Sequence, residues 1–332
     1  MAQLLGLDIG YGFVKATNGE NGYVFPSVVG DASEKQIYYS TIQQTDPLGN
    51  LRVRIDDRVF FVGKSAIRHS NLAFRALSTT RSEGTHMRVL SLSAVALFCD
   101  RSQNKFEVVT GLPPGRMHLA KYMVDQVKGI HRIGVYQNGT ARDAEVDISS
   151  VEVVPQPLGT YWSQTLSGSE PAAEHLEGRT GVIDIGYVTT DLAAIEDGEF
   201  VPGRSTTIKV GLADAYVDIA SRLFREYGLE REPYTLDGAV IKGKVTVSGE
   251  EVDITPICNG AFERLATKVL VELMSVWRIQ EFDRLYLSGG GGQSLSPYLL
   301  PHVPQGKLAD DPITANCRGF WAWGKRQRQT EI

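Results

Sequence analysis

Short apolar runs separated by turn residues make up the first third of the chain. Runs with the alternation of apolar and polar positions that is typical of strands lie at residues 4–9, 13–17, 23–28, 51–55 and 59–62. Strand-like runs that are bounded by turn residues commonly pair as hairpins. This part of the chain is therefore predicted to form a sheet with antiparallel edges.

Helical and strand-like stretches alternate in the rest of the first half. The pattern predicts helices at 85–100, 111–128 and 158–166, and strands at 106–110 and 146–154. The pair Asn138-Gly139 predicts a hairpin turn. Residues 167–179 are small, polar and acidic, which indicates a linker.

After this linker the alternation starts again. Strands are predicted at 181–185, 192–195, 206–210 and 284–288, and helices at 214–227, 254–280 and 313–327. Strands that alternate with helices in both halves indicate an α/β fold. A chain of 332 residues is also long enough for two lobes, each with its own core.

One tetrapeptide occurs in both halves of the chain. Asp-Ile-Gly-Tyr begins at Asp8, at the end of the first apolar strand, and it begins again at Asp184, at the end of the strand that opens the second half. In each place more strand-like residues follow. An internal duplication explains this repetition most simply.

Composition and charge limit the classes of function. The chain is 42% hydrophobic and 22% charged, as in an average soluble globular protein. Its net charge of −5 argues against a broad basic surface for nucleic acid. The local basic group Lys325, Arg326 and Arg328 is interpreted as the solvated end of a helix. Direct binding of nucleic acid is therefore not expected.

Three features predict a cytoplasmic protein. Cys99, Cys258 and Cys317 lie far apart without a CxxC pair, so neither a zinc site nor a disulfide framework is indicated. The chain enters an apolar strand pattern at once, without a basic leader, so we expect no signal peptide. The longest apolar stretch, 92–99, is too short to span a bilayer, and no direct membrane partner is expected.

The repeated turn after the first strand is a candidate phosphate and metal site. The N–H groups of Gly10, Tyr11 and Gly12 can bind phosphate oxygens, because glycine allows close approach of the backbone. Lys15 adds a cation for the same phosphates. Asp8 would repel a phosphate, so its expected partner is a hydrated Mg²⁺.

The second turn repeats this arrangement with Asp184, Gly186, Tyr187, Thr189 and Thr190. Two such turns that faced each other would hold a polyphosphate from both sides. A single Asp after a strand is commonly a turn former or a helix cap. The repetition therefore carries the prediction of a nucleotide site.

A run of glycines follows the strand predicted at 284–288. Gly289, Gly290 and Gly291 would leave a flat backbone surface on which a purine base could lie. The alternative is a flexible linker, which the flanking apolar strand and helix argue against. Gly211 precedes a helix and either lines the nucleotide or takes part in helix capping. Glycine contacts of this kind do not distinguish ATP from GTP.

Five segments, in chain order, resemble the motifs of the superfamily that contains actin, DnaK-type chaperones and sugar kinases. They are a first phosphate motif at 7–15, a first connecting motif at 154–159, a second phosphate motif at 182–191, an adenosine motif at 287–292 and a second connecting motif at 315–320. Four segments resemble one branch of this superfamily, the ParM/StbA proteins, which are bacterial, mostly plasmid-encoded, actin-like proteins. These segments are the opening Asp-Ile-Gly-Tyr-Gly, Phe25-Pro26-Ser27, Thr110-Gly111-Leu112-Pro113 and residues 311–316.

The resemblance implies an actin-like ATPase fold. Such a fold has two similar lobes with ribonuclease-H-like duplicated cores and a nucleotide cleft between them. The first lobe would span 1–166 with a smaller insertion at about 30–84, the second would span 178–312 with an insertion at about 212–260, and a C-terminal helix at 313–332 would return to the first lobe.

The resemblance also implies roles for single residues. Asp8, Gln156 and Asp184 would surround a Mg²⁺ ion and its waters, with Gln156 orienting the attacking water and Asp184 assisting it. The adenosine would be bound by Gly211, Gly289, Gly290, Gly291 and Gln293. Gln156 stands where the ParM/StbA branch commonly has glutamate, and a neutral amide accepts a proton poorly, which affects the expected rate of hydrolysis.

The function implied by the resemblance is ATP-driven self-assembly into dynamic filaments. Such filaments would move plasmid DNA through an adaptor protein, and the lobes would close about a hinge near Gly159 and Gly319. One alternative is a small-molecule, sugar-type kinase, which would need a catalytic-base Asp in a substrate pocket. Another is a regulatory ATPase that does not polymerise. The fold alone does not decide among these functions.

Overall fold

The computed structural model describes residues 2–32, 46, 48–70, 74–75, 84–100, 103–137, 140–166 and 177–330. The chain divides into two compact units. The first unit contains Met1–Pro171 and Thr314–Ile332, and the second contains Ala172–Ile313. Both units combine a sheet with helices, which confirms the predicted α/β class.

The first unit contains a ten-stranded sheet. Its strands are β1 (Gln3–Ile9), β2 (Phe13–Thr17), β3 (Gly22–Pro26), β4 (Val28–Ala32), β5 (Arg52–Ile55), β6 (Arg58–Val62), β7 (Phe74–Arg75), β8 (Gln103–Leu112), β9 (Gly129–Gln137) and β10 (Thr140–Pro155). Their order is β3-β2-β1-β8-β10-β9-β5-β6-β4-β7. β8 is parallel to both β1 and β10, whereas the other pairs of neighbours are antiparallel.

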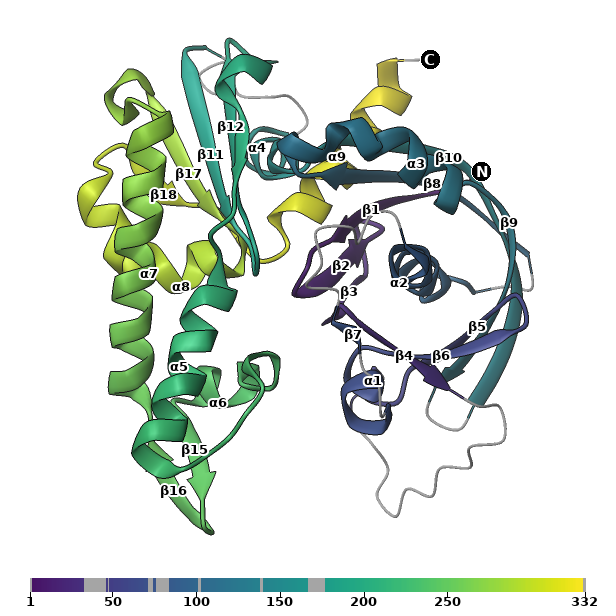
Figure 1. Ribbon diagram of the computed structural model, residues 1–332. Coiled ribbons are helices and arrows are strands. Elements are labelled where there is room, and N and C mark those ends of the chain that lie inside the picture. The colour runs from purple at the N-terminus through teal and green to yellow at the C-terminus, as the bar shows by residue number, and fades with distance from the viewer. Residues whose placement is uncertain are drawn as a thin grey trace. The chain divides into compact units, whose positions relative to one another are not determined.

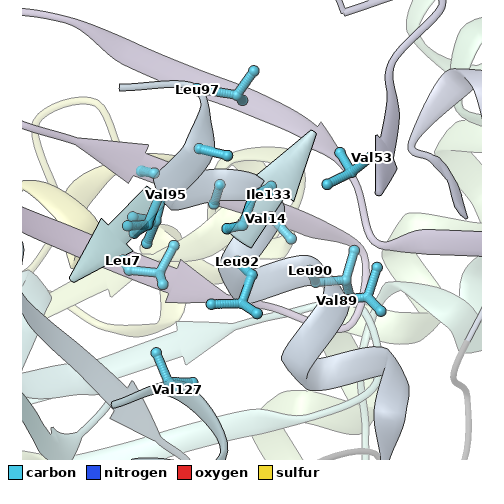
Figure 2. Packing of buried hydrophobic residues seen from close by; sticks show 14 of the residues in the cluster. Leu7, Val14, Val53, Val89, Leu90, Leu92, Val95, Leu97, Val127 and Ile133 are labelled. Atoms are coloured by element: carbon cyan, nitrogen blue, oxygen red, sulfur yellow. The ribbon is translucent and has the colours of Figure 1, made fainter. Parts of the chain in front are cut away.

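The core of the first unit surrounds a helix. The helices of this unit are α1 (Lys64–His69), α2 (Thr85–Ala96), η2 (Pro114–Leu119), α3 (Ala120–Val127), α4 (Pro157–Thr165) and α9 (Ala315–Thr330). The strands of this unit curve around α2 (Figure 1). Every residue of α2 from Val89 to Ala96 is buried, so this part of the helix is enclosed on all sides. Leu92 of α2 belongs to one cluster with Leu7 of β1 and Ile133 of β9 (Figure 2).

The polar groups of α2 find partners inside this core. Ser91 and Ser93 are buried, and each hydroxyl donates to the carbonyl four residues earlier. Arg142 of β10 closes the C-terminal end of the helix, because its guanidinium donates to the carbonyls of Ala96, at 3.1 Å, and of Cys99. A cation at this end also interacts favourably with the helix dipole.

α4 and α9 pack against each other without room for a side chain between them. A Cβ atom added at Gly319 of α9 would lie 1.7 Å from the carbonyl oxygen of Gly159 in α4. Asn316 of α9 adds a polar link, because its Oδ1 accepts from the backbone N–H of Thr160, at 3.0 Å, and from the Thr160 hydroxyl, at 2.8 Å. The two connecting segments named from the sequence therefore meet within the first unit.

The second unit contains a smaller sheet. Its elements are β11 (Arg179–Ile185), β12 (Thr190–Glu196), β13 (Glu199–Phe200), η4 (Pro202–Arg204), β14 (Thr206–Ile208), α5 (Leu212–Tyr227), η5 (Pro233–Thr235), α6 (Asp237–Lys242), β15 (Lys244–Val247), β16 (Glu250–Asp253), α7 (Thr255–Val276), η6 (Ile279–Glu281), β17 (Arg284–Ser288), α8 (Gly289–Leu299), η7 (Leu300–His302) and β18 (Gly306–Leu308). The strand order is β13-β12-β11-β17-β18, with β14 also paired to β12.

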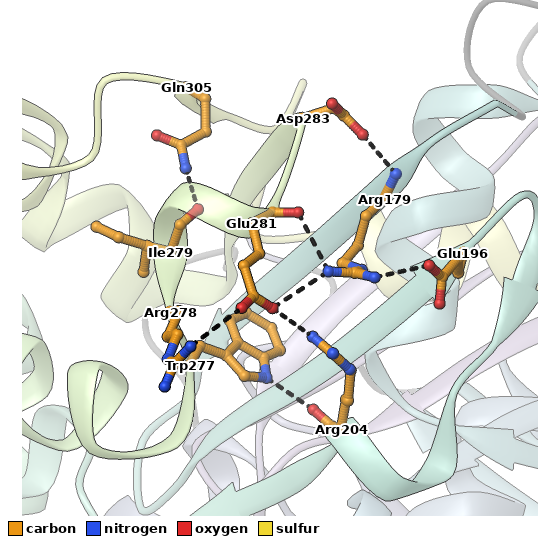
Figure 3. A network of polar contacts seen from close by, with 9 residues as sticks. All are labelled: Arg179, Glu196, Arg204, Trp277, Arg278, Ile279, Glu281, Asp283 and Gln305. Atoms are coloured by element: carbon orange, nitrogen blue, oxygen red, sulfur yellow. Dashed lines mark hydrogen bonds and ion pairs between the residues drawn. The ribbon is translucent and has the colours of Figure 1, made fainter.

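An ion-pair network joins the start of β11 to its neighbours (Figure 3). Arg179 pairs with Glu196 of β12 at 2.7 Å and with Glu281 of η6 at 3.2 Å. Glu281 also pairs with Arg204 at 2.8 Å, and these guanidinium groups hold the pKa of the Glu281 carboxyl below its usual value. Because Glu281 and Arg204 are substantially exposed, the network contributes little to the free energy of unfolding.

The structure corrects several boundaries predicted from the sequence, including the following two. The helix predicted at 111–128 is wrong at its start, because Gly111 and Leu112 still belong to β8 and α3 begins only at Ala120. The following Pro113 disfavours a helical backbone at the residue before it. The linker predicted at 167–179 is wrong at its end, since Arg179 opens β11, while 167–176 lie outside the described residues.

Two other predicted features fall partly or wholly outside the described residues. The Asn138-Gly139 turn lies between described strands, β9 and β10, but is not itself described. The insertion expected at about 30–84 is described only in part. In the part of the chain that the structure describes, no helix is both long and apolar enough to cross a bilayer.

His131 of β9 should make the stability of the fold depend on pH. Its ring is 9% exposed, and burial lowers the pKa of the imidazole. Nε2 lies 2.8 Å from the carbonyl oxygen of Val127, and Nδ1 lies 3.5 Å from a nitrogen of Arg88, which further opposes protonation. A neutral ring with its proton on Nε2 satisfies both contacts.

We therefore expect the free energy of unfolding to fall as the pH drops below about 6.5, where the unfolded chain binds a proton that the folded chain does not. The loss is about 1.4 kcal/mol for each unit by which folding lowers the pKa. Urea denaturation between pH 5 and 8 measures it. His131→Gln should flatten the curve between these limits, whereas His302→Gln, which removes an exposed histidine, should not. Equal slopes in all three proteins would contradict this prediction.

Candidate functional site

A buried carboxylate lies at the end of β1. Asp8 is 2% exposed, and the antiparallel register of β1 and β2 sets it opposite Lys15. The Lys15 Nζ lies 3.0 Å from Asp8 Oδ2. A hairpin whose turn is Gly10, Tyr11 and Gly12 thus brings the predicted metal residue into contact with the predicted phosphate-binding cation.

Gln156 reaches the same carboxylate from far along the chain. β1 and β10 both run parallel to β8, so their C-terminal ends lie at one edge of the sheet. Gln156 follows β10, and its Nε2 donates to Asp8 Oδ1 at 2.9 Å. Each oxygen of Asp8 therefore has one partner. Since the amide nitrogen faces Asp8, the Gln156 Oε1 atom is the end that can accept a hydrogen bond from water.

Ser27 holds the turn in shape, a role that the sequence interpretation did not assign. It is 1% exposed, its hydroxyl donates to the carbonyl of Gly10 at 2.6 Å, and its backbone N–H donates to the carbonyl of Gly12 at 2.9 Å. Ser27 directly follows β3, which pairs with β2. The position of this small hydroxyl residue after a strand that pairs with the turn was the available signal.

In the second unit, Asp184 occupies the corresponding place near the end of β11. It is 4% exposed and lies beside Ser288 of the parallel strand β17. The next residue, Gly289, has a φ of 78°, and a Cβ atom there would lie 2.5 Å from Asp184 Oδ1. Glycine is therefore required at 289 both by the backbone conformation and by the carboxylate.

The turn after Asp184 uses several of its own polar groups. The Gly186 N–H donates to the carbonyl of Thr189 at 2.8 Å, so this amide closes the turn. The buried Thr190 hydroxyl donates to the carbonyl of Val210 at 2.9 Å, and this bond joins β12 to the segment before α5. The ring of Tyr187 is buried. The Gly186 N–H and the Thr190 hydroxyl therefore both make bonds within the fold, and a role of this turn toward phosphate stays a prediction.

Gly211 caps α5. Its N–H donates to Asp214 Oδ2 at 3.1 Å, and the Asp214 N–H donates back to the Gly211 carbonyl at 3.0 Å. A Cβ atom at Gly211 would lie 2.7 Å from the carbonyl oxygen of Tyr187, so the start of this helix packs directly on the Asp184 turn. The capping role left open by the sequence is thus present. A role toward adenosine stays a prediction.

The glycine run forms the first turn of α8. Gly289 and Gly291 pack against Ile185, whose atoms would lie within 2.4 Å of an added Cβ. A Cβ atom at Gly290 would meet only Leu212, at 3.8 Å, and Gln293 is exposed. Gly290 is the glycine of this run with room beside it, so the predicted adenosine contacts depend on it first.

Each of the two candidate metal residues suits magnesium better than a transition metal. Within the described residues, no group of three or more His, Cys, Asp or Glu side chains could hold a metal ion. Mg²⁺ is commonly bound through one or two carboxylates, with water and phosphate oxygens completing its shell. Asp8 and Asp184, each a buried carboxylate near a strand end, suit that mode.

Comparison with known proteins identifies the family. The model for the N-terminal domain of actin-like proteins matches residues 6–159, and the model for the C-terminal part of the archaeal actin homologue, described as MreB-like, matches residues 182–300. Both describe actin homologues, and together they span most of the chain. The chain belongs to the actin-like proteins. A search of curated protein sequences found no match.

Solved structures of actin-like proteins have the same fold as this chain. A ParM from a 15-stranded filament of Clostridium botulinum is similar at a TM-score of 0.82 and 23% identity, covering 98% of this chain and 100% of that one. An archaeal actin homologue in complex with ADP gives 0.78 and 20%, covering 98% and 100%. A Bacillus thuringiensis ParM with AMPPNP gives 0.76 and 15%, covering 98% and 99%. The predicted actin-like fold is confirmed.

We expect the Asp8–Lys15 ion pair to stabilise the fold, and we expect removal of one partner to lower the free energy of unfolding. Lys15 and Asp8 have side chains that are 14% and 3% exposed. Lys15→Met should lower the free energy of unfolding by about 3 kcal/mol, because a buried carboxylate then loses its cation. Adding Asp8→Asn should recover part of the loss. Urea denaturation measures both.

Lys64→Met is the matched control for this cycle. The Lys64–Asp46 pair is 2.7 Å long, but its side chains are 56% and 41% exposed, so the cost should stay below about 1 kcal/mol. An equal cost for Lys15→Met and Lys64→Met would contradict the importance of burial at Asp8.

Proposed function

We propose that this actin-like protein binds ATP with Mg²⁺, hydrolyses it, and assembles with copies of itself into dynamic filaments. In this proposal the filaments segregate plasmid DNA in the cytoplasm, and an adaptor protein connects them to the DNA.

The contact of Asp8 with Lys15 and Gln156 carries the proposal. A buried carboxylate, a cation and an amide that meet at the end of one strand are the groups that phosphoryl transfer to water requires. If the Asp8–Lys15 ion pair served only the stability of the fold, the additional bond from Gln156 would not be required. By contrast, the exposed network around Arg179 and Glu281 joins neighbouring elements through ion pairs between arginine and glutamate side chains.

Each residue has a chemical role in this reaction. Lys15 neutralises negative charge that develops on the phosphate oxygens. Gln156, held by its bond to Asp8, presents Oε1 to the attacking water and orients it. An amide is a poor proton acceptor, so the proton of that water passes to a carboxylate, and Asp184 is the residue we assign to it. A bound Mg²⁺ would supply further charge neutralisation, held through water by Asp8 and Asp184.

The similar structures support the nucleotide and the filament. One was solved as a filament, one with ADP and one with AMPPNP, a stable analogue of ATP. Their identities to this chain are low, so nucleotide and assembly are proposals that follow from the fold and from the Asp8 contacts together.

We expect the purified protein to form sedimentable polymer with ATP and Mg²⁺, and to lose it as the nucleotide is hydrolysed. Pelleting and light scattering with ATP, GTP, ADP and AMPPNP measure this. Polymer that persists in AMPPNP and decays in ATP is the expected result, because hydrolysis would then destabilise the assembled state.

Two outcomes would contradict this proposal and support a different function. Consumption of ATP that rises sharply when a sugar is added would indicate a kinase. Steady release of phosphate without any polymer, at any protein concentration tested, would indicate a regulatory ATPase.

Asp184→Ala should keep the fold and abolish phosphate release. The bonds from the Gly186 N–H to Thr189 and from the Thr190 hydroxyl to Val210 hold this turn without the Asp184 carboxylate, so the circular dichroism spectrum should be unchanged. Asp57→Ala, a change at an exposed turn residue of the first unit, should leave the rate at the wild-type level. A wild-type rate in Asp184→Ala would show that the carboxylate only shapes its turn.

A further inference from the structure

Asp191 of β12 is a second buried carboxylate beside Asp184. It is 3% exposed. The strand registers set it directly opposite Asp184 of β11 on one side and opposite Thr207 of β14 on the other. Residues directly opposite on neighbouring strands point to the same face of the sheet, with Cβ atoms about 4.5–5.5 Å apart. Asp184, Asp191 and Thr207 therefore form one row across three strands.

Two threonine hydroxyls hold Asp191. The Thr207 hydroxyl lies 2.6 Å from Asp191 Oδ1, and the Thr189 hydroxyl lies 3.2 Å from Asp191 Oδ2. An ionised carboxylate can only accept hydrogen bonds, so both hydroxyls are donors. A hydroxyl has a single proton. Because Thr189 donates its hydroxyl hydrogen to Asp191, it can only accept hydrogen bonds from other groups, through its oxygen lone pairs.

The corresponding row in the first unit has a lysine where this row has its second carboxylate. There Asp8 of β1 lies opposite Lys15 of β2, and Lys15 lies opposite Val24 of β3. The place that Lys15 occupies in the first row is taken by Asp191 in the second. A row with a lysine attracts phosphate, whereas a row with two carboxylates repels phosphate and attracts a cation with its water shell.

We propose that the turn after Asp184 is the cation side of the nucleotide site, and that Thr207 is a positioning residue for it. This inference rests on the proposed binding of ATP with Mg²⁺. Thr207 donates a hydrogen bond to Asp191 and holds it in place, and Asp191 accepts the hydrogen bond that the Thr189 hydroxyl donates. The Thr189 oxygen then accepts a hydrogen bond from a water of the hydrated cation. The sequence analysis predicted that Thr189 binds phosphate. In this inference Thr189 binds the water shell of the cation instead.

The neighbouring residue Thr206 provides a matched control. Thr206 and Thr207 lie on the same strand, but successive strand residues point to opposite faces, and Thr206 pairs with Leu192 rather than with Asp191. Thr206→Val and Thr207→Val therefore make the same chemical change on the two faces of β14. Thr207→Ser keeps the hydroxyl and should restore the wild-type behaviour.

The experiment measures the dissociation constant of ATP by calorimetry, once with Mg²⁺ and once with EDTA. Thr207→Val should weaken binding about tenfold with Mg²⁺, since it removes a hydrogen bond to a charged group, and should leave binding in EDTA unchanged. Thr206→Val and Thr207→Ser should match the wild type in both. The broadening of the Mn²⁺ electron paramagnetic resonance signal in the ATP complex should decrease in Thr207→Val alone.

Thr189→Val tests the same inference without changing β14. It should weaken binding only with Mg²⁺, because its oxygen faces the water shell of the cation. A loss of affinity in EDTA would show that Thr189 donates to phosphate, and equal losses of Thr207→Val in both buffers would show a structural role for Thr207. Either result overturns the inference and leaves nucleotide binding intact. Absence of any affinity in the wild-type protein would instead overturn the proposed function, and the inference with it.

Discussion

The buried carboxylate of Asp8 sets the main constraint on the first unit. Moving a carboxylate out of water is costly unless other polar groups replace the lost hydration. The hairpin register supplies Lys15, and the parallel order of β1, β8 and β10 supplies Gln156 from 148 positions along the chain. The curved sheet around α2 and the close packing of α9 hold these strands in the register that the carboxylate needs.

The two units use one strand-turn-strand arrangement with different charges. In the first, an acidic residue faces a lysine across the hairpin, and in the second, Asp184 faces Asp191. Like charges opposite each other on a sheet are destabilising unless something neutralises or bonds to them. Two threonine hydroxyls meet part of that need at Asp191. The duplicated backbone therefore provides chemically different surfaces at the two turns.

Local pattern was a good guide where a segment decides its own conformation. The apolar stretch from Thr85 predicted α2, and the alternating runs near the start predicted β1 and β2. The pattern was a poor guide where a neighbouring element competes. β8 continues through Gly111 because β10 pairs with it there, although the sequence favours a helix from that point. The repeated turn drew attention to Thr190, but the bond of its hydroxyl to the carbonyl of Val210 could not be inferred from the motif.

By itself the sequence determined the fold class, the family and the repeated acidic turn, because periodicity and short motifs are local properties of the chain. It could not decide which groups meet. The sequence did not reveal the contacts of Ser27, Thr160 and Thr207, which depend on strand order, register and helix packing. Contacts between distant segments depend on the three-dimensional path of the chain. The resemblance placed Gln156 near Asp8, but only the tertiary structure showed the direct hydrogen bonds from Gln156 to Asp8 and from Thr207 to Asp191.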